Sequence, residues 1–407
     1  MSARALSVWM YDSRIGELVR QRRSLAFTYT PEALAEGIGR PLLSVAMPTQ
    51  VQPFRGALPH AFFNGLLPEG EARRMIAYDF RVDADDAFAL LEAIGRDCAG
   101  ALVIAPAGET VLETGTPESI SDAAVAERLR KLRFEPLGTD QRVRASLAGV
   151  QEKLLLARIG DGWGLPVDGA PSTHILKPAH PLLADSIANE ALCMRVAHHL
   201  GLPVAPVEVR AFAGIRTLVV ERYDRMSTQS GTIRVHQEDF CQATTTDVQR
   251  KYEEHGGPSL LRCAETLRRW SAHEGQLEVL LDYLALNVLI GNADAHAKNL
   301  SLLHEPAGGV RLAPLYDLTC TAWYPNVSTI AGMFVNSIRD IGVVTPDDVI
   351  GEATGWGIPT SIAKARVDRL LADAEQAIRR AALEVDPPDG LVDLLLARAS
   401  RALDDCP

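Results

Sequence analysis

The sequence predicts an α+β fold in which a β-rich lobe precedes an all-helical lobe, with a small mixed subdomain in front of both. Three observations lead to this prediction. The chain has 407 residues, enough for two or three domains. Short strand patterns dominate residues 142–235, which hold one clear helical pattern at 186–200. Helical periodicity dominates the last part, residues 236–407, at 260–273, 277–290, 361–385 and 391–403.

The first subdomain is expected to cover residues 1–105. It has strand patterns at 6–11, 25–29 and 101–104 and helical patterns at 70–78 and 84–94. Residues 106–141 are expected to connect it to the β-rich lobe, because the composition turns to Gly, Pro, Thr and Glu after residue 106. Within that lobe we expect a glycine-rich turn at 160–169 and strands at 174–177, 204–209 and 217–220.

Composition excludes several classes of protein. Hydrophobic residues make up 47% of the chain and charged residues 23%, so a disordered chain is excluded. The net charge of −11 argues against binding DNA or RNA alone, which needs clustered Lys and Arg. The six cysteines include no CxxC pair, and no apolar run suits a signal peptide or a membrane span. We therefore expect a cytoplasmic protein with reduced thiols and no membrane contact.

The segment most informative about chemistry is the polar loop at 291–299, which follows an apolar helix and precedes an apolar strand. Asp294 and Asn299 are five residues apart, and Asp317 follows a short strand. Kinases use such an Asp to orient the attacking hydroxyl, and an Asn with a later Asp to hold Mg²⁺. The alternative is that Asp294 caps a helix and Asp317 belongs to a turn.

Two basic groups of this loop invite other interpretations. His296, with His304 nearby, could indicate a transition-metal site, but no Cys or further His stands at ligand spacing. Lys298 is either solvated or a contact for substrate or the γ-phosphate of a nucleotide. We favour the phosphate contact.

The β-rich lobe must then supply a lysine for the nucleotide phosphates. Lys153 and Lys177 are candidates, and Lys177 ends an apolar strand as the kinase lysine does. Glu190, thirteen residues later on the helical pattern, would orient that lysine. The alternative is an exposed lysine and a solvated glutamate.

Two further segments could contact a nucleotide. The loop before the first strand of this lobe is rich in small residues and can approach phosphates closely; its candidates are Ala148, Gly149, Val150, Gln151, Glu152 and Lys153. It is neither a G-x-G-x-x-G nor a Walker A motif, so this signal alone is weak. Glu221 and Tyr223 follow a strand at the junction of the lobes and could offer backbone groups to adenine. The alternatives are a hairpin turn and a charged strand end.

Together these segments resemble the HipA family, the serine/threonine-protein kinase toxins of bacterial type II toxin–antitoxin pairs. The resemblance covers nearly the whole chain in the right order. Its motifs are SLAGVQEK (146–153), THILK (173–177), VERYDR (220–225), QEDFCQ (237–242), NADAHAKN (292–299) and PLYD (314–317), with NGLLPE (64–69) and IGRD (94–97) in the first subdomain.

The resemblance implies a protein-kinase-like bilobal fold and a role for each motif. Asp294 is implied as the catalytic base, and Asn299 and Asp317 as ligands of Mg²⁺. Binding of ATP is implied for the 148–153 loop, Lys177, Glu221, Tyr223, His296, Lys298, Asn299 and Asp317. Ser146 matches the serine that these kinases phosphorylate in themselves, which switches them off.

The resemblance also implies partners. The family phosphorylates aminoacyl-tRNA synthetases, chiefly glutamate–tRNA ligase, which blocks translation and arrests growth. A HipB-like antitoxin would supply the basic surface that this acidic chain lacks, so operator DNA would be bound only through that complex. Two other functions remain open: a small-molecule phosphotransferase with the same loop, and a regulatory module that binds ATP without turnover.

Overall fold

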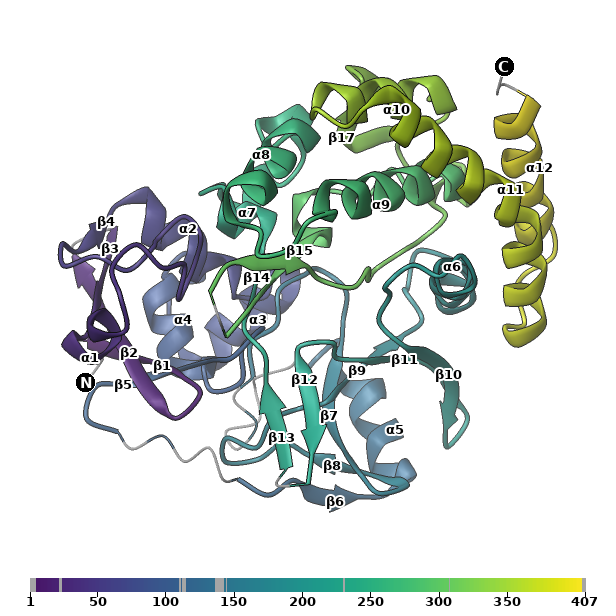
Figure 1. Ribbon diagram of the computed structural model, residues 1–407. Helices are drawn as coiled ribbons and strands as arrows, with labels where there is room; N and C mark the ends of the chain where they lie inside the picture. Colours follow the sequence, from purple (N-terminus) through teal and green to yellow (C-terminus); the bar gives the residue numbers. More distant parts are fainter. Residues whose placement is uncertain are drawn as a thin grey trace. The chain divides into compact units, whose positions relative to one another are not determined.

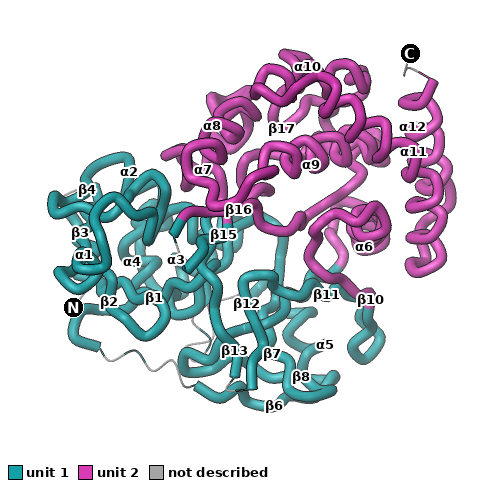
Figure 2. The backbone as a smooth tube through the Cα atoms, in the orientation of Figure 1, with its two compact units in different colours: residues 1–178, 210–238, 303–308 teal, residues 179–209, 239–302, 309–407 magenta. Residues whose placement is uncertain are grey.

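The computed structural model describes residues 5–21, 24–109, 111, 115–135, 143, 145–229, 231–306 and 308–404. The chain divides into two compact units (Figure 2). Unit 1 comprises residues 1–178, 210–238 and 303–308, and unit 2 comprises residues 179–209, 239–302 and 309–407. The predicted boundary between residues 141 and 142 lies outside the described residues.

The first part of unit 1 is an antiparallel sheet with helices (Figure 1). Its strand order is β4-β3-β2-β1-β5, from β1 (Ala5–Met10), β2 (Ser13–Gln21), β3 (Ser24–Tyr29), β4 (Phe54–Arg55) and β5 (Leu102–Pro106). The helices are α1 (Pro31–Ala35), α2 (Ala57–Gly65), α3 (Gly70–Phe80) and α4 (Ala87–Ile94). Leu6, Val8 and Leu18 of the sheet form one apolar core with Phe62 and Phe63 of α2.

A second sheet lies mostly in unit 1. Its order is β10-β11-β9-β7-β8-β6, from β6 (Glu118–Ile120), β7 (Leu154–Ile159), β8 (Gly162–Leu165), β9 (His174–Pro178), β10 (Val207–Phe212) and β11 (Ile215–Glu221). Helix α5 (Asp122–Lys131) buries Val125 and Leu129 in the same core as β7 and β8, and β12 (Arg225–Thr228) pairs with β13 (Gly231–Arg234). The expected turn at 160–169 is therefore wrong in part, because Trp163 is buried and β8 pairs with β7.

Unit 2 is mainly helical. Its helices are α6 (Ser186–His199), α7 (Phe240–Ala243), α8 (Leu260–Trp270), α9 (Gln276–Ile290), α10 (Pro346–Gly355), α11 (Thr360–Glu384) and α12 (Leu391–Asp404). Helix α11 packs along α6, α9, α10 and α12. Short 3₁₀ helices span Val248–Arg250, Glu253–His255, Ala297–Asn299 and Thr321–Trp323.

The expectation that residues 236–407 are all helical needs a correction. Strands β14 (Gln237–Asp239), β15 (Ser301–His304) and β16 (Val310–Leu312) form a three-stranded sheet, and β17 (Ile330–Val335) pairs with β18 (Ile338–Asp340). These strands are three to six residues long, so their alternation is too brief to show in the sequence pattern.

Two other expectations concern cysteines and membranes. Cys98, Cys193, Cys241, Cys263 and Cys320 are buried free thiols, while Cys406 lies outside the described residues. Among the described helices, none combines the length and the apolar character needed to cross a membrane.

A buried ionic cluster joins the two sheets of unit 1. The Asp97 carboxylate, which follows α4, accepts hydrogen bonds from the Ser172 hydroxyl at 2.5 Å and the Arg225 guanidinium at 2.9 Å. Arg222, which follows β11, donates from Nε and Nη2 to the two oxygens of Asp224 at 2.9 and 2.8 Å. The side chains of these four charged residues are at most 4% exposed. Buried charges of this kind are tolerated only when they are paired.

The charges of this cluster keep the carboxyl group of Asp97 ionised. Burial alone would raise the pKa of its carboxyl, but the guanidiniums of Arg225, Arg222 and Arg234 outweigh burial, so the pKa lies well below its usual range. The carboxylate therefore stabilises the folded state at pH values above its unfolded pKa of about 4, and this contribution is lost as the pH falls below that value.

We predict that Asp97→Asn lowers the free energy of unfolding by about 3–5 kcal/mol at pH 7, because it removes one of the carboxylates that neutralise the buried guanidiniums of Arg222 and Arg225. Urea unfolding measures this, and the variant should also lose part of the fall in stability below about pH 4. Glu36→Gln is the control, since Glu36 pairs with Arg40 at the surface and should change stability by less than about 1 kcal/mol. Equal stabilities for the two variants would contradict the prediction.

Candidate active site

The loop at 291–299 begins at a sharply defined helix end. Gly291 ends α9 in the left-handed conformation at φ +67°, and the amides of Gly291 and Asn292 donate to the carbonyls of Val288 and Asn287. A guanidinium from α12 completes this end, because Arg398 donates to the carbonyls of Leu289 at 3.0 Å and Val288 at 2.7 Å. Helix ends favour this combination of a glycine and a cation.

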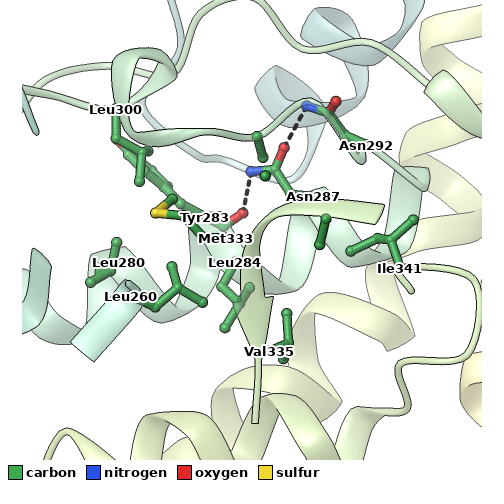
Figure 3. A pocket seen from close by; sticks show the side chains of 13 residues that line it. Leu260, Leu280, Tyr283, Leu284, Asn287, Asn292, Leu300, Met333, Val335 and Ile341 are labelled. Atoms are coloured by element: carbon green, nitrogen blue, oxygen red, sulfur yellow. Dashed lines mark hydrogen bonds between the residues drawn. The ribbon is translucent and has the colours of Figure 1, made fainter. Parts of the chain in front are cut away.

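Two asparagines fix the course of the chain after the helix. Asn292 Nδ2 donates to Asn287 Oδ1 at 2.8 Å, and Asn292 Oδ1 accepts from the Asp294 amide at 3.1 Å. Figure 3 shows this asparagine pair beside a cavity of about 20 Å³ beneath the loop. A cavity of that size holds about one water molecule, so the side chains beneath the loop are closely packed.

Asp294 and Asn299 belong to one hydrogen-bonded turn. The Asp294 carbonyl accepts from Asn299 Nδ2 at 2.9 Å and from the His296 amide at 2.8 Å. The Asp294 side chain is exposed, and its Oδ1 accepts a hydrogen bond from the Tyr252 hydroxyl at 2.6 Å. Because the amide nitrogen of Asn299 is bonded to backbone, its Oδ1 is the atom suited to a metal.

A glycine of β17 lies directly against this turn. The Gly332 amide donates to the Ala293 carbonyl at 2.7 Å. A Cβ atom at Gly332 would lie 2.7 Å from the His296 nitrogen and 2.8 Å from the Ala295 carbonyl carbon, closer than real Cβ contacts. The close approach therefore requires glycine and holds the backbone of the loop in place.

Asp317 is held near the same loop within unit 2. The hydroxyl of the preceding Tyr316 donates to the Lys298 carbonyl at 2.6 Å and lies 2.7 Å from the Ser301 hydroxyl. Asp317 itself is half-buried and adopts φ +58°, a left-handed conformation that is uncommon outside glycine. Residues in such conformations occur often at functional sites.

His296 is buried beside the turn. Its ring packs edge-on against the Tyr252 ring with centroids 4.9 Å apart, and its Nδ1 has no hydrogen-bond partner among the described residues. Burial lowers the pKa of His296 to about 3, assisted by the Lys251 ammonium and opposed by the Asp317 carboxylate. The imidazole is therefore neutral near pH 7.

Lys298 lies in a different setting from the one expected. It is buried, and its ammonium forms an ion pair with Asp239 Oδ2 at 2.6 Å. Asp239 also caps α7, accepting from the Gln242 amide through Oδ1 at 2.9 Å. A contact between Lys298 and a phosphate stays a prediction, beside this structural ion pair.

In unit 1 the small-residue loop that follows Ser146 is anchored by hydrogen bonds to residues of the first subdomain. Ser146 is fully buried; its hydroxyl donates to the Leu66 carbonyl at 2.8 Å and its amide to the Asp97 carbonyl at 2.9 Å. The Glu69 amide donates to the Gly149 carbonyl at 3.2 Å.

The rest of this loop folds back on itself. The Lys153 ammonium donates to the Ala148 carbonyl, which closes the loop, and Val150 at its tip is 61% exposed. Gln151 and Glu152 are half-buried. Residues 148–153 thus form a short loop that this hydrogen bond closes.

Lys177 and Glu221 belong to the neighbouring strands β9 and β11, whose side chains alternate between the two faces of the sheet. Lys177 on β9 stands opposite Leu218 on β11 and is half-buried, whereas its neighbour Leu176 points into the core. Glu221, the last residue of β11, is exposed; Tyr223 after the strand is half-buried, and its hydroxyl donates to Gln237 Oε1.

Glu190 belongs to α6 in unit 2 and is buried, so it is not a solvated helix charge. Its neighbour Asn189 bonds both the carbonyl and the amide of Cys320, at 3.0 and 2.9 Å, and so ties α6 to the segment after Asp317. The predicted pairing of Glu190 with Lys177 stays a prediction.

Comparison with known proteins identifies the family. The model of the HipA-like C-terminal domain matches residues 145–378, more than half of the chain, and the model of the HipA N-terminal domain matches residues 6–105. The chain belongs to the HipA family. It is therefore a protein kinase, and the predicted resemblance is confirmed.

Individual HipA relatives cover most of the chain. The protein Y4mE of Sinorhizobium fredii is 37% identical over 391 residues, 93% of this chain and 92% of the relative. The serine/threonine-protein kinase toxin HipA of Shewanella oneidensis is 30% identical over 344 residues, 81% and 78% of the two chains. The solved Shewanella oneidensis complex of HipA, HipB and operator DNA matches with a TM-score of 0.86 and 28% identity, over 98% of this chain and 97% of that chain. This match confirms the predicted fold class.

Sequence reasoning missed several residues that build the site. Tyr252 and Gly332 contact the 291–299 loop, and Arg398 contacts the end of α9 before it, each from a distant part of the sequence. Tyr252 stands between Lys251 and Glu253 in a polar segment before a Gly-Gly-Pro turn, and that local concentration of charge was the only signal available.

Proposed function

We propose that this kinase transfers the γ-phosphoryl group of ATP to serine or threonine, with Asp294 as catalytic base and Asn299 and Asp317 as Mg²⁺ ligands. The observation that supports this is the geometry of the 291–299 loop, in which the Asn299 side chain is bonded to the Asp294 backbone at 2.9 Å. Catalysis of phosphoryl transfer depends mainly on positioning and on stabilising charge. A turn braced at Asn292 and Gly332 suits that requirement.

The donor set fits Mg²⁺, which prefers carboxylate and carbonyl oxygens. Asp317 offers a carboxylate and Asn299 an amide oxygen, while the neighbouring His296 is neutral and so adds no repulsive charge. When bound, the ion would neutralise negative charge on the transferred phosphoryl group. Asp294 would accept a hydrogen bond from the substrate hydroxyl and orient it for attack.

The nucleotide would be bound by residues with two kinds of contact. Lys177 and the amides of the 148–153 loop would contact phosphates, and Glu221 and Tyr223 would meet adenine through backbone groups. His296, Lys298, Asn299 and Asp317 are proposed on the phosphate side, and Glu190 as the residue that orients Lys177. The observations behind this proposal are the closed loop at Lys153 and the half-buried position of Lys177 at the end of β9.

We further propose that the chain is the toxin of a type II toxin–antitoxin pair. Its relative from Shewanella oneidensis is a kinase toxin that was solved with HipB and operator DNA. A HipB-like antitoxin would supply the positive charge that binding DNA needs, since this chain carries a net charge of −11. The substrate proposed is an aminoacyl-tRNA synthetase, with glutamate–tRNA ligase first, and its phosphorylation would block translation and cause growth arrest and persistence.

The catalytic assignment predicts that Asp294→Asn and Asp317→Asn each slow phosphoryl transfer about 100-fold or more. The purified chain is incubated with Mg²⁺, [γ-³²P]ATP and either glutamate–tRNA ligase or a bacterial extract. The rate at which ³²P is incorporated into protein is measured. Asp373→Asn, which changes an exposed carboxylate on α11, should label at the wild-type rate.

Three results of this assay would contradict different parts of the proposal. Wild-type labelling by Asp294→Asn would remove the catalytic role of Asp294. Labelling of extract proteins without labelling of glutamate–tRNA ligase would reject that substrate alone. Phosphorylation of a sugar or an aminoglycoside with no labelled protein would favour a small-molecule phosphotransferase.

Autophosphorylation is proposed at Ser146. Because this hydroxyl is buried and bonded to the Leu66 carbonyl, it has to leave its site before it can accept a phosphoryl group. A phosphate carries a charge of about −1.5 to −2, and the buried site presents a carbonyl oxygen to it. The modified loop would therefore not return, and the kinase would be switched off.

We predict that Ser146→Asp lowers kinase activity at least about 10-fold, since a buried carboxylate without a counter-ion costs several kcal/mol. Ser146→Ala should keep its activity on other proteins and lose the labelled peptide that contains residue 146. Ser119→Asp, at an exposed position of β6, is the control for an added charge. Full activity of Ser146→Asp, or an unchanged peptide in Ser146→Ala, would refute the proposal.

A further inference from the structure

Tyr252 contacts the proposed catalytic base directly. Its hydroxyl donates to Asp294 Oδ1 at 2.6 Å, the length of a hydrogen bond to an ionised oxygen. We propose that Tyr252 is a positioning residue for phosphoryl transfer, which holds the Asp294 carboxylate in the orientation that meets the substrate hydroxyl. This inference rests on the proposed role of Asp294.

The backbone around Tyr252 is fixed on both sides. The Lys251 carbonyl accepts from the amide of Ala297, in the 291–299 loop, at 3.4 Å. The Glu253 carboxylate accepts from the Phe334 amide of β17 at 2.7 Å. Three consecutive residues therefore contact the loop, Asp294 and the strand that supports the loop. The Tyr252 hydroxyl is thus held at one place relative to Asp294.

The ring of Tyr252 is fixed as well. It packs edge-on against the buried His296 ring, with an angle of 84° between the planes. A ring held by such packing cannot follow the carboxylate if Asp294 rotates, so the hydrogen bond favours one rotamer of Asp294. Asp294 needs this restraint because its side chain is exposed.

The hydrogen bond has opposite effects on two properties of Asp294. A donated hydrogen bond makes a carboxylate a weaker base, which would slow a step limited by proton abstraction. The same bond orients the carboxylate, which speeds a step limited by positioning. Phosphoryl transfer through a loose transition state needs little help from a base, so orientation should dominate. The sign of the change on removal of the hydroxyl therefore separates the two effects.

The test is Tyr252→Phe, which removes the hydroxyl and keeps the ring against His296. Initial rates of Asp294-dependent protein labelling are measured in bacterial extract over a range of ATP concentrations. We expect kcat to fall about 10- to 100-fold and the KM for ATP to change less than about 2-fold, since one hydrogen bond to a charged group is lost. Tyr324→Phe, which removes a hydroxyl elsewhere in unit 2, should leave both constants unchanged.

The possible outcomes are distinguishable. An unchanged or increased kcat in Tyr252→Phe would overturn the inference, and so would a loss that appears only in KM. An equal loss of kcat in Tyr324→Phe would also overturn it, because any missing hydroxyl would then suffice. If Asp294→Asn labels proteins at the wild-type rate, the catalytic role of Asp294 fails instead, whatever Tyr252→Phe does.

Discussion

The end of α9 is the constraint on which the rest of the site depends. A chain that leaves a helix must satisfy its last carbonyls, and here Gly291 and the Arg398 guanidinium do so within a single turn. This sharp end delivers Asn292 to its partner Asn287 and, two residues later, Asp294 to the surface. The position of Asp294, the candidate base, therefore follows from the capping of α9 and from the hydrogen bond between the Asn292 side chain and the Asp294 amide.

In unit 1 the buried ionic cluster and the Ser146 loop share one residue, Asp97. Asp97 has two functions, because its carboxylate lies in the buried ionic cluster while its carbonyl accepts the Ser146 amide. The loop that carries Ser146 is thus attached to a residue whose own position is set by strong electrostatic pairing. The Ser146 hydroxyl in this loop is buried and donates to the Leu66 carbonyl.

The sequence predicted the fold class and the motif order well, and specific contacts poorly. Helices such as α9 and α11 were predicted because long apolar periodicity needs no knowledge of partners. The glycines at 162 and 164 favour a turn in the sequence pattern, which conceals strand β8 and its pairing of Trp163 with Arg158. The pairing of Arg225 with Asp97 could not be predicted, because the two residues are distant in sequence. The ion pair of Lys298 with Asp239 could not be predicted either, because the two residues are remote in sequence.

The braced backbone at 291–299 is the basis of the proposed chemistry, and Gly332 tests it most directly. Gly332→Ala places a Cβ 2.7 Å from the His296 nitrogen and so displaces the loop without changing any proposed catalytic side chain. Gly355→Ala in α10 is the matched control, because its Cβ meets nothing within 4 Å. Initial rates of protein labelling should fall about 100-fold in Gly332→Ala and stay unchanged in Gly355→Ala. Wild-type rates in a folded Gly332→Ala protein would contradict the account.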